Sequence, residues 1–121
     1  MTRDEVRAFL LGRARAWRAG DLDAIMDDYA PDVVLIAPGV RLEGPDALRA
    51  SNERYLAEYT EIDVELTRVI VDGDQGALEW TWSETRRADG RRRSVDDAIV
   101  FVLRDRKIVY WREYFDTAAL D

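Results

Sequence analysis

The hydrophobic pattern of this chain changes its period near residue 60, and that change limits the folds open to it more than any other feature. Before residue 60 the apolar residues recur mainly three and four positions apart, which is typical of helices with one buried face. From Ile62 onward they alternate or form short runs, which is typical of strands. Helices followed by strands predict an α+β fold.

Three helices are predicted in the first half of the chain. The first spans Thr2–Ala19, and Glu5 stands at the capping-box spacing from its first residue. The second is capped by Asp21, carries its apolar face as far as Tyr29 and is ended by Pro31.

A short strand and its turn separate the second helix from the third. The β-branched run Val33–Ala37 predicts the strand, and residues 41–43 predict a brief returning edge. The third helix opens within residues 45–46 and carries Tyr55 and Tyr59 on its apolar face.

Four further strands are predicted after residue 60. They cover Ile62–Val71, Ala77–Arg87, Arg92–Leu103 and Lys107–Phe115. Asp89 and Gly90, between the second and third of these strands, are a strong hairpin signal. Because the sequence contains no internal repeat or linker, we expect a single domain over residues 1–121, with these strands in an antiparallel meander.

Cysteine and histidine are both absent, which excludes disulfides, thiolate nucleophiles, Ser-His triads and the usual zinc ligands. We therefore expect no metal and no cofactor, and acid–base chemistry must use Asp, Glu, Tyr, Lys or Arg. The net charge of −7 argues against a nucleic-acid partner, because phosphate is repelled by an acidic surface. No apolar stretch approaches the roughly 20 residues that span a bilayer, so we expect no membrane partner and a cytoplasmic location.

Four segments carry a family resemblance: Trp17–Asp23, Tyr29–Val33, Glu43–Leu48 and Ile108–Asp116. They resemble the NTF2-like superfamily and, more narrowly, its SnoaL-like and ketosteroid-isomerase-like branch. The resemblance implies a cystatin-like cone in which three N-terminal helices pack in a curved antiparallel sheet. It also implies a conical pocket for a small-molecule ligand, and homodimers formed through the outer face of the sheet.

The resemblance points to catalytic positions, most of which have changed in this chain. The base, oxyanion-binding tyrosine and protonated aspartate of ketosteroid isomerases would fall at Ala37, at Arg13 and near Ile99, so none is retained. Of the set in limonene-epoxide hydrolases, one carboxylate is kept as Glu113. The other four positions of that set are Trp80, Trp82, Leu35 and Ala37. SnoaL-type cyclases use an aspartate with a nearby histidine, which this chain lacks.

Two acids remain as candidates for acid–base catalysis. Glu113 alternates with Trp111 on the last predicted strand, and on an inward face desolvation would raise its pKa. With the opposite parity, Glu113 would instead pair with an arginine. Asp97 shares the parity of Ile99 and is expected to enter the pocket, whereas Asp96 faces out.

Aromatic and small apolar residues are expected to line the pocket. Trp80 and Trp82 point to one face of their strand, where they either pack the core or form a wall for a flat ligand. The predicted substrate-binding residues are Trp17, Tyr29, Leu35, Ala37, Tyr55, Tyr59, Trp80, Trp82, Ile99 and Trp111.

Two groups of arginines have open interpretations. Arg13, the third candidate catalytic residue, either orients a substrate by binding an anionic group or forms a buried pair with Glu113 or Asp97. The arginines of the predicted hairpin are solvated, dock an acidic partner or pair with acidic helices in a dimer. They are Arg86, Arg87, Arg91, Arg92 and Arg93.

Two functions remain open from the sequence. The first is an isomerase, hydrolase or cyclase that uses carboxylate acid–base chemistry on a small, mainly apolar organic molecule. The second is a non-catalytic ligand-binding or dimerisation domain, because the fold implied by the resemblance serves many activities.

Overall fold

The computed structural model describes residues 1–120; position 121, the last residue of the expected domain, lies outside the described residues. Within residues 1–120 there are three α-helices, six strands and a closing 3₁₀ turn. In chain order they are α1 (Arg3–Ala19), α2 (Leu22–Asp27), β1 (Tyr29–Ala37), β2 (Val40–Glu43), α3 (Pro45–Glu58), β3 (Tyr59–Asp72), β4 (Gln75–Arg86), β5 (Arg92–Arg104), β6 (Lys107–Tyr114) and η1 (Thr117–Leu120). The expected α+β class is confirmed.

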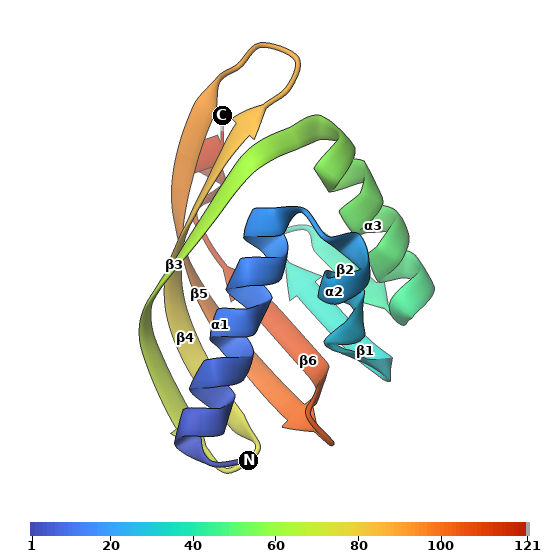
Figure 1. Ribbon diagram of the computed structural model, residues 1–121, viewed down its shortest axis with the longest axis vertical. Helices are drawn as coiled ribbons and strands as arrows, with labels where there is room; N and C mark the ends of the chain where they lie inside the picture. Colours follow the sequence, from blue (N-terminus) through green and yellow to red (C-terminus); the bar gives the residue numbers. More distant parts are fainter. Residues whose placement is uncertain (121) are drawn as a thin grey trace.

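The strands form one curved sheet that wraps around α1 (Figure 1). Their order is β2-β1-β6-β5-β4-β3, and the neighbours are antiparallel except for β1 and β6. The sheet is therefore mixed, which corrects the expectation of a wholly antiparallel one. The parallel pair joins the first strand to the last, and a pairing so distant in sequence leaves no local pattern.

Local capping explains where α1 begins and ends. The Thr2 hydroxyl accepts from the Glu5 backbone N–H at 3.1 Å, and the Glu5 carboxylate accepts from the Thr2 N–H at 2.9 Å, so the predicted capping box is present. Gly20 ends the helix in the left-handed conformation, with φ of 63°. The helix buries a face that packs on the sheet, formed by Val6, Leu10, Arg13, Ala14 and Trp17.

The concave face of the sheet provides most of the core. On β5, Asp97, Ile99 and Phe101 are buried, whereas the residues between them are exposed. Large side chains at the centre of this face, among them Trp111, are almost inaccessible to solvent. Burial of each such side chain stabilises the fold by roughly 1.5–3 kcal/mol.

Two tyrosines predicted on helices belong instead to strands. The second helix ends at Asp27, and Tyr29 begins β1. Pro31 does not end a helix but lies within β1, where pairing with β6 is irregular and a missing N–H costs little. Similarly, Tyr59 has extended dihedral angles (φ −123°, ψ 149°) and begins β3.

No helix within residues 1–120 is both long and apolar enough to cross a membrane.

Candidate functional site

A cavity of about 340 Å³ lies between the helices and the concave face of the sheet. Helix α1 contributes Arg13 and Trp17, α3 contributes Ser51, Asn52 and Tyr55, and the strands form the remaining walls. The apolar and aromatic lining consists of Trp17, Leu35, Ala37, Val40, Leu42, Tyr55, Tyr59, Trp80, Trp82, Val95, Trp111, Phe115 and Leu120.

The aromatic rings of this lining form a continuous series. The rings of Trp17 and Trp82 lie edge to face at 5.1 Å between centroids, and Trp82 lies 6.0 Å from Trp80. Trp80 in turn lies 5.7 Å from Trp111. Trp80 is buried, but Trp82 is only half-buried, so part of this aromatic surface remains exposed to solvent.

Asp97 is the most strongly perturbed acid of the cavity. It lies directly opposite Trp80 in the β4–β5 pairing and is only 5% exposed. Desolvation, followed by hydrogen bonding and charge from Glu113, raises the pKa of Asp97 to about 10. Within residues 1–120 neither Oδ1 of Asp97 nor Nε1 of Trp80 has a hydrogen-bond partner, although both atoms are buried. Asp97 is therefore held in its neutral, protonated form at neutral pH.

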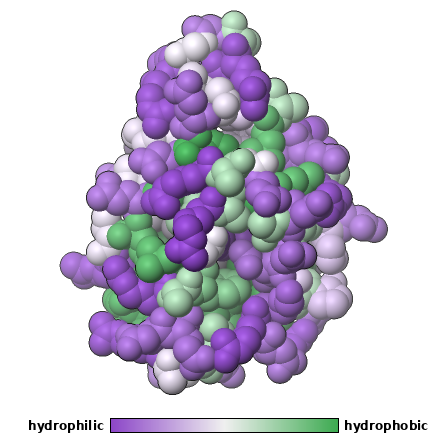
Figure 2. All heavy atoms as spheres, in the orientation of Figure 1, coloured by the Kyte–Doolittle hydropathy of each residue, from purple (hydrophilic) through white to green (hydrophobic). Residues whose placement is uncertain are grey.

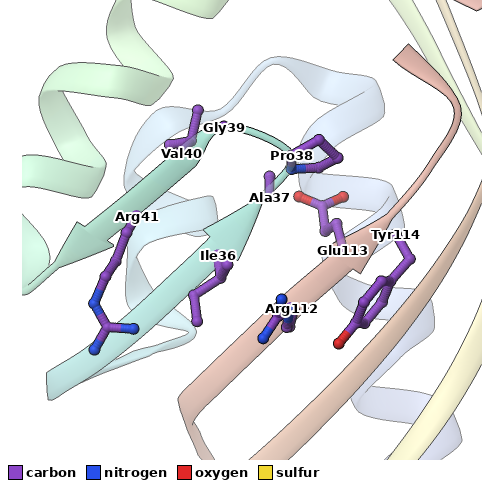
Figure 3. A pocket seen from close by; sticks show the side chains of 9 residues that line it. All are labelled: Ile36, Ala37, Pro38, Gly39, Val40, Arg41, Arg112, Glu113 and Tyr114. Atoms are coloured by element: carbon purple, nitrogen blue, oxygen red, sulfur yellow. The ribbon is translucent and has the colours of Figure 1, made fainter.

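Glu113 lies between the cavity and a second hollow, the outer groove, of about 400 Å³. The outer groove is lined by residues 36–41 and 112–114 (Figure 3). In Figure 3 the Glu113 carboxylate extends toward Ala37 and Pro38, whereas Tyr114 points the other way. Ala37, Val40 and Glu113 line both hollows, so these three residues lie between the cavity and the outer groove, near the end of strand β1.

Arg13 is buried at the wall of the cavity, but not in either ion pair expected from the sequence. Its Nη1 lies 3.6 Å from Oδ2 of Asp28, and its Nη2 donates to the Tyr29 hydroxyl at 2.5 Å. The expected pairing with Glu113 or Asp97 is wrong because Asp28, at the end of α2, supplies the carboxylate.

A buried network at the other end of the cavity was not foreseen. Glu84 accepts from Nε of Arg93 at 2.6 Å and from Nε1 of Trp82 at 3.0 Å, and it also accepts from the Tyr55 hydroxyl. Arg93 further donates to the Tyr59 hydroxyl at 2.6 Å. Desolvation and hydrogen bonding to Glu84 raise the pKa of Tyr55 above its usual range.

This network corrects the interpretation of Arg93 as one of a set of solvated hairpin arginines. Figure 2 shows a mostly hydrophilic hairpin tip. Arg93 lies instead on strand β5 with the parity of Asp97, and its side chain is only 16% exposed. A sequence signal for Glu84 does exist: it alternates with Trp80 and Trp82 on one strand, and this parity indicates a position inside the cavity.

A family model described as the SnoaL-like domain matches residues 3–111. The chain belongs to the SnoaL-like domain family. Solved structures agree with this at the level of the fold. AclR from Streptomyces galilaeus has a TM-score of 0.85 at 21% identity, with 98% of this chain and 94% of that chain covered.

Two further structures similar to this SnoaL-like domain have more informative descriptions. A protein of ketosteroid isomerase-like fold from Catenulispora acidiphila, in complex with trimethylamine, has a TM-score of 0.83 at 17% identity, covering 92% of this chain and 87% of that chain. An LEH-like epoxide hydrolase from M. tuberculosis has a TM-score of 0.81 at 22% identity, covering 93% and 83%. A comparison with curated proteins finds no match.

In this SnoaL-like domain the cavity gathers most of the residues named from the sequence. Those that line it are Arg13, Trp17, Leu35, Ala37, Tyr55, Tyr59, Trp80, Trp82, Asp97, Trp111 and Glu113. Tyr29 and Ile99 are buried but do not line the cavity, because Tyr29 lies against Arg13 and Ile99 packs within the core cluster. Among residues 1–120 no three acidic side chains are grouped to hold a metal ion.

Proposed function

We propose that this SnoaL-like domain binds a small, mainly apolar organic molecule in the aromatic cavity and acts on it by carboxyl acid–base chemistry. The observation that carries the proposal is the buried Asp97 beside Glu113 in a cavity walled by tryptophan. A protonated Asp97 is suited to work as the acid, and the second carboxyl group of the cavity, that of Glu113, is available as its partner.

The proposed chemistry uses one proton donor and one acceptor. Glu113 removes a proton from a carbon next to a carbonyl group, or from an attacking water, and Asp97 donates its proton to the oxygen that gains electron density. In an isomerisation, Glu113 returns its proton to another carbon, and Asp97 recovers its own when the carbonyl re-forms. Arg13 orients the substrate from the wall of the cavity. No cofactor is required for these steps.

The reaction classes that fit are isomerisation, hydration of a strained ring and cyclisation. The similar structures described as an epoxide hydrolase and as a complex with trimethylamine support a small organic ligand for this fold. These two structures are 22% and 17% identical to this chain, which supports the same fold but does not select a reaction. The experiment below distinguishes the reaction classes.

A non-catalytic binding domain is the second candidate, and the replaced positions favour it. Ala37 lines the cavity with no functional group. The rings of Trp80 and Trp82 occupy two positions at which the limonene-epoxide hydrolases that this chain resembles carry polar groups. In this case the cavity holds its ligand without changing it.

Deuterium exchange distinguishes the two candidates. The protein is incubated in D₂O with a panel of enolisable ketones and epoxides, and α-deuteration and diol formation are followed by NMR. If the proposal is right, Asp97→Asn and Glu113→Gln slow the accelerated reaction by about 10²- to 10⁴-fold. The control is Asp96→Asn, the exposed neighbour on the opposite face, which changes the rate by less than about twofold. Ligand binding without any accelerated exchange would support the non-catalytic domain.

We also propose that a second copy of the chain covers the outer face of the sheet. Three large hydrophobic side chains are exposed there: Ile70 at 58%, Val100 at 43% and Tyr114 at 51%. Neighbouring Arg112 stacks on Tyr114, with 5.0 Å between guanidinium carbon and ring centroid, and adds the kind of cation that interfaces favour.

A further inference from the structure

Arg13 lines the cavity and is almost completely buried, which is rare for a charged side chain. Only 3% of the residue is exposed, and its guanidinium carbon lies 4.5 Å from the centre of the Trp111 ring and 4.8 Å from that of Tyr29. Arg13 and Trp111 both belong to the lining of the cavity. Burial of a guanidinium is costly unless an anion and hydrogen bonds compensate it.

The compensation within the chain is incomplete. The Asp28 carboxylate is 3.6 Å away, beyond the distance of a good charge-assisted hydrogen bond. Nε and Nη1 of Arg13 are buried and have no hydrogen-bond partner within residues 1–120. Asp28 is itself desolvated, which raises its pKa despite the nearby arginine and weakens it as a permanent counter-ion.

The other charged groups of the cavity leave Arg13 as the place for an anion. Arg93 is occupied by Glu84, by the Tyr59 hydroxyl and by the carbonyl oxygen of Leu120. Asp97 and Glu113 also line the cavity, but neither supplies a positive charge that would hold a carboxylate. A ligand anion is therefore directed to the Arg13 end, with the apolar body along Trp111 and Trp80 toward Asp97.

We propose that Arg13 binds a carboxylate on the ligand, so that the substrate class is a flat, mainly apolar organic acid. This inference rests on the proposed function of the cavity and adds the polarity and orientation of its ligand. The planar fork of the guanidinium suits a carboxylate, and the free N–H groups supply donors that Asp28 leaves unused.

The test compares two probes of the same shape, 2-naphthoate and the neutral 2-naphthamide, by isothermal titration calorimetry. We expect the wild-type protein to bind 2-naphthoate about ten- to a hundred-fold more tightly than 2-naphthamide, as for hydrogen bonds to a charged group in a dry site. Arg13→Gln should remove this preference and leave the affinity for 2-naphthamide within about threefold. Arg49→Gln, which removes an exposed arginine paired with Asp23 outside the cavity, is the matched control and should keep the preference.

A second variant guards against the chance that Arg13→Gln misfolds. Asp28→Asn removes the competing carboxylate with little change of shape, and Asp28 does not line the cavity. We expect it to tighten 2-naphthoate by about three- to ten-fold without affecting 2-naphthamide. Weaker binding of 2-naphthoate by Asp28→Asn would overturn the inference, because Arg13 would then serve only a structural pair.

The remaining outcomes separate this inference from the proposed function. Equal binding of both probes by the wild-type protein would overturn the carboxylate site and leave the apolar cavity as proposed. Binding of neither probe would count against the cavity as a ligand site and would overturn the inference with it.

Discussion

Asp97 shows how the surroundings of a single residue determine both its protonation state and its effect on the free energy of folding. Its carboxyl group is buried against Trp80 and beside Glu113, so the folded protein favours its neutral form. In the unfolded chain the same group ionises near pH 4. Above that pH, folding therefore requires Asp97 to take up a proton.

This difference predicts a pH-dependent gain in stability for Asp97→Asn. Because the pKa of Asp97 is higher in the folded state, the folded protein binds more protons than the unfolded one, and stability falls as the pH rises toward 10. The asparagine variant has no proton to take up on folding. Its unfolding free energy should therefore rise relative to that of the wild-type protein between pH 5.5 and pH 8.5, by up to about 1.4 kcal/mol per pH unit.

Urea unfolding of both proteins at the two pH values measures the effect, with Asp96→Asn as the exposed control. A difference in unfolding free energy that does not change with pH would show that Asp97 is not held neutral. A stabilised but inactive Asp97→Asn variant would agree with the acid–base role proposed for this residue.

The sequence placed Asp97 correctly because strand parity is a local property. Asp97 alternates with exposed neighbours, and the same alternation placed Asp96 outside. Arg93 shares that parity but was grouped with the hairpin arginines by composition, and its partner Glu84 lies on another strand. The partner of Arg13 was missed for a similar reason, since Asp28 is brought to it by the turn after α2.

At the scale of elements, strand β4 contains a position that only glycine can occupy. A Cβ atom at Gly76 would lie 2.3 Å from the carbonyl oxygen of Ile70 and 2.7 Å from a ring carbon of Phe101. The first contact is with the backbone of β3 and cannot be relieved by a side-chain rotation.

Gly76→Ala is therefore expected to destabilise the fold by about 1–3 kcal/mol through overpacking. Gly12→Ala is the matched control within α1, where the new Cβ meets only the Arg15 side chain at 3.5 Å. That substitution should stabilise the protein by up to about 1 kcal/mol, because alanine is the better helix former. Thermal unfolding should give melting temperatures that shift in opposite directions for the two variants. An unchanged melting temperature for Gly76→Ala would contradict the close contact between Gly76 and the Ile70 carbonyl oxygen.

The boundaries of elements were predictable only where capping chemistry is local. Thr2 and Glu5 mark the start of α1 in the sequence as they do in the structure, and the predicted end at Ala19 is confirmed. Tyr29 and Tyr59 fitted the helical spacing, but tertiary pairing placed both in strands. The parallel contact of β1 with β6 had no local signal at all.

At the scale of the whole molecule, the exposed apolar side chains of the outer sheet face predict self-association. Val100→Asp places a charge opposite Arg112, at the centre of the row formed with Ile70. If a second copy covers this face, the variant should be monomeric where the wild-type protein is dimeric, because a carboxylate replaces an apolar side chain in the interface and its desolvation is costly even beside Arg112.

Light scattering coupled to gel filtration gives the masses directly. Ala88→Asp adds the same charge at the exposed hairpin tip, away from this face, and should leave the dimer intact. A monomeric wild-type protein, or a Val100→Asp variant that stays dimeric, would argue against the outer face as the interface.

The parallel pairing of β1 with β6 also determines when the cavity exists during synthesis. Leu35 and Ala37 are made early, but Leu35 pairs with Trp111, near the end of the chain. A partly synthesised chain therefore has a helix and a hairpin without the strand that anchors them. The wall of the cavity is completed only after β6 leaves the ribosome, so a nascent chain cannot form the cavity before this strand has been made.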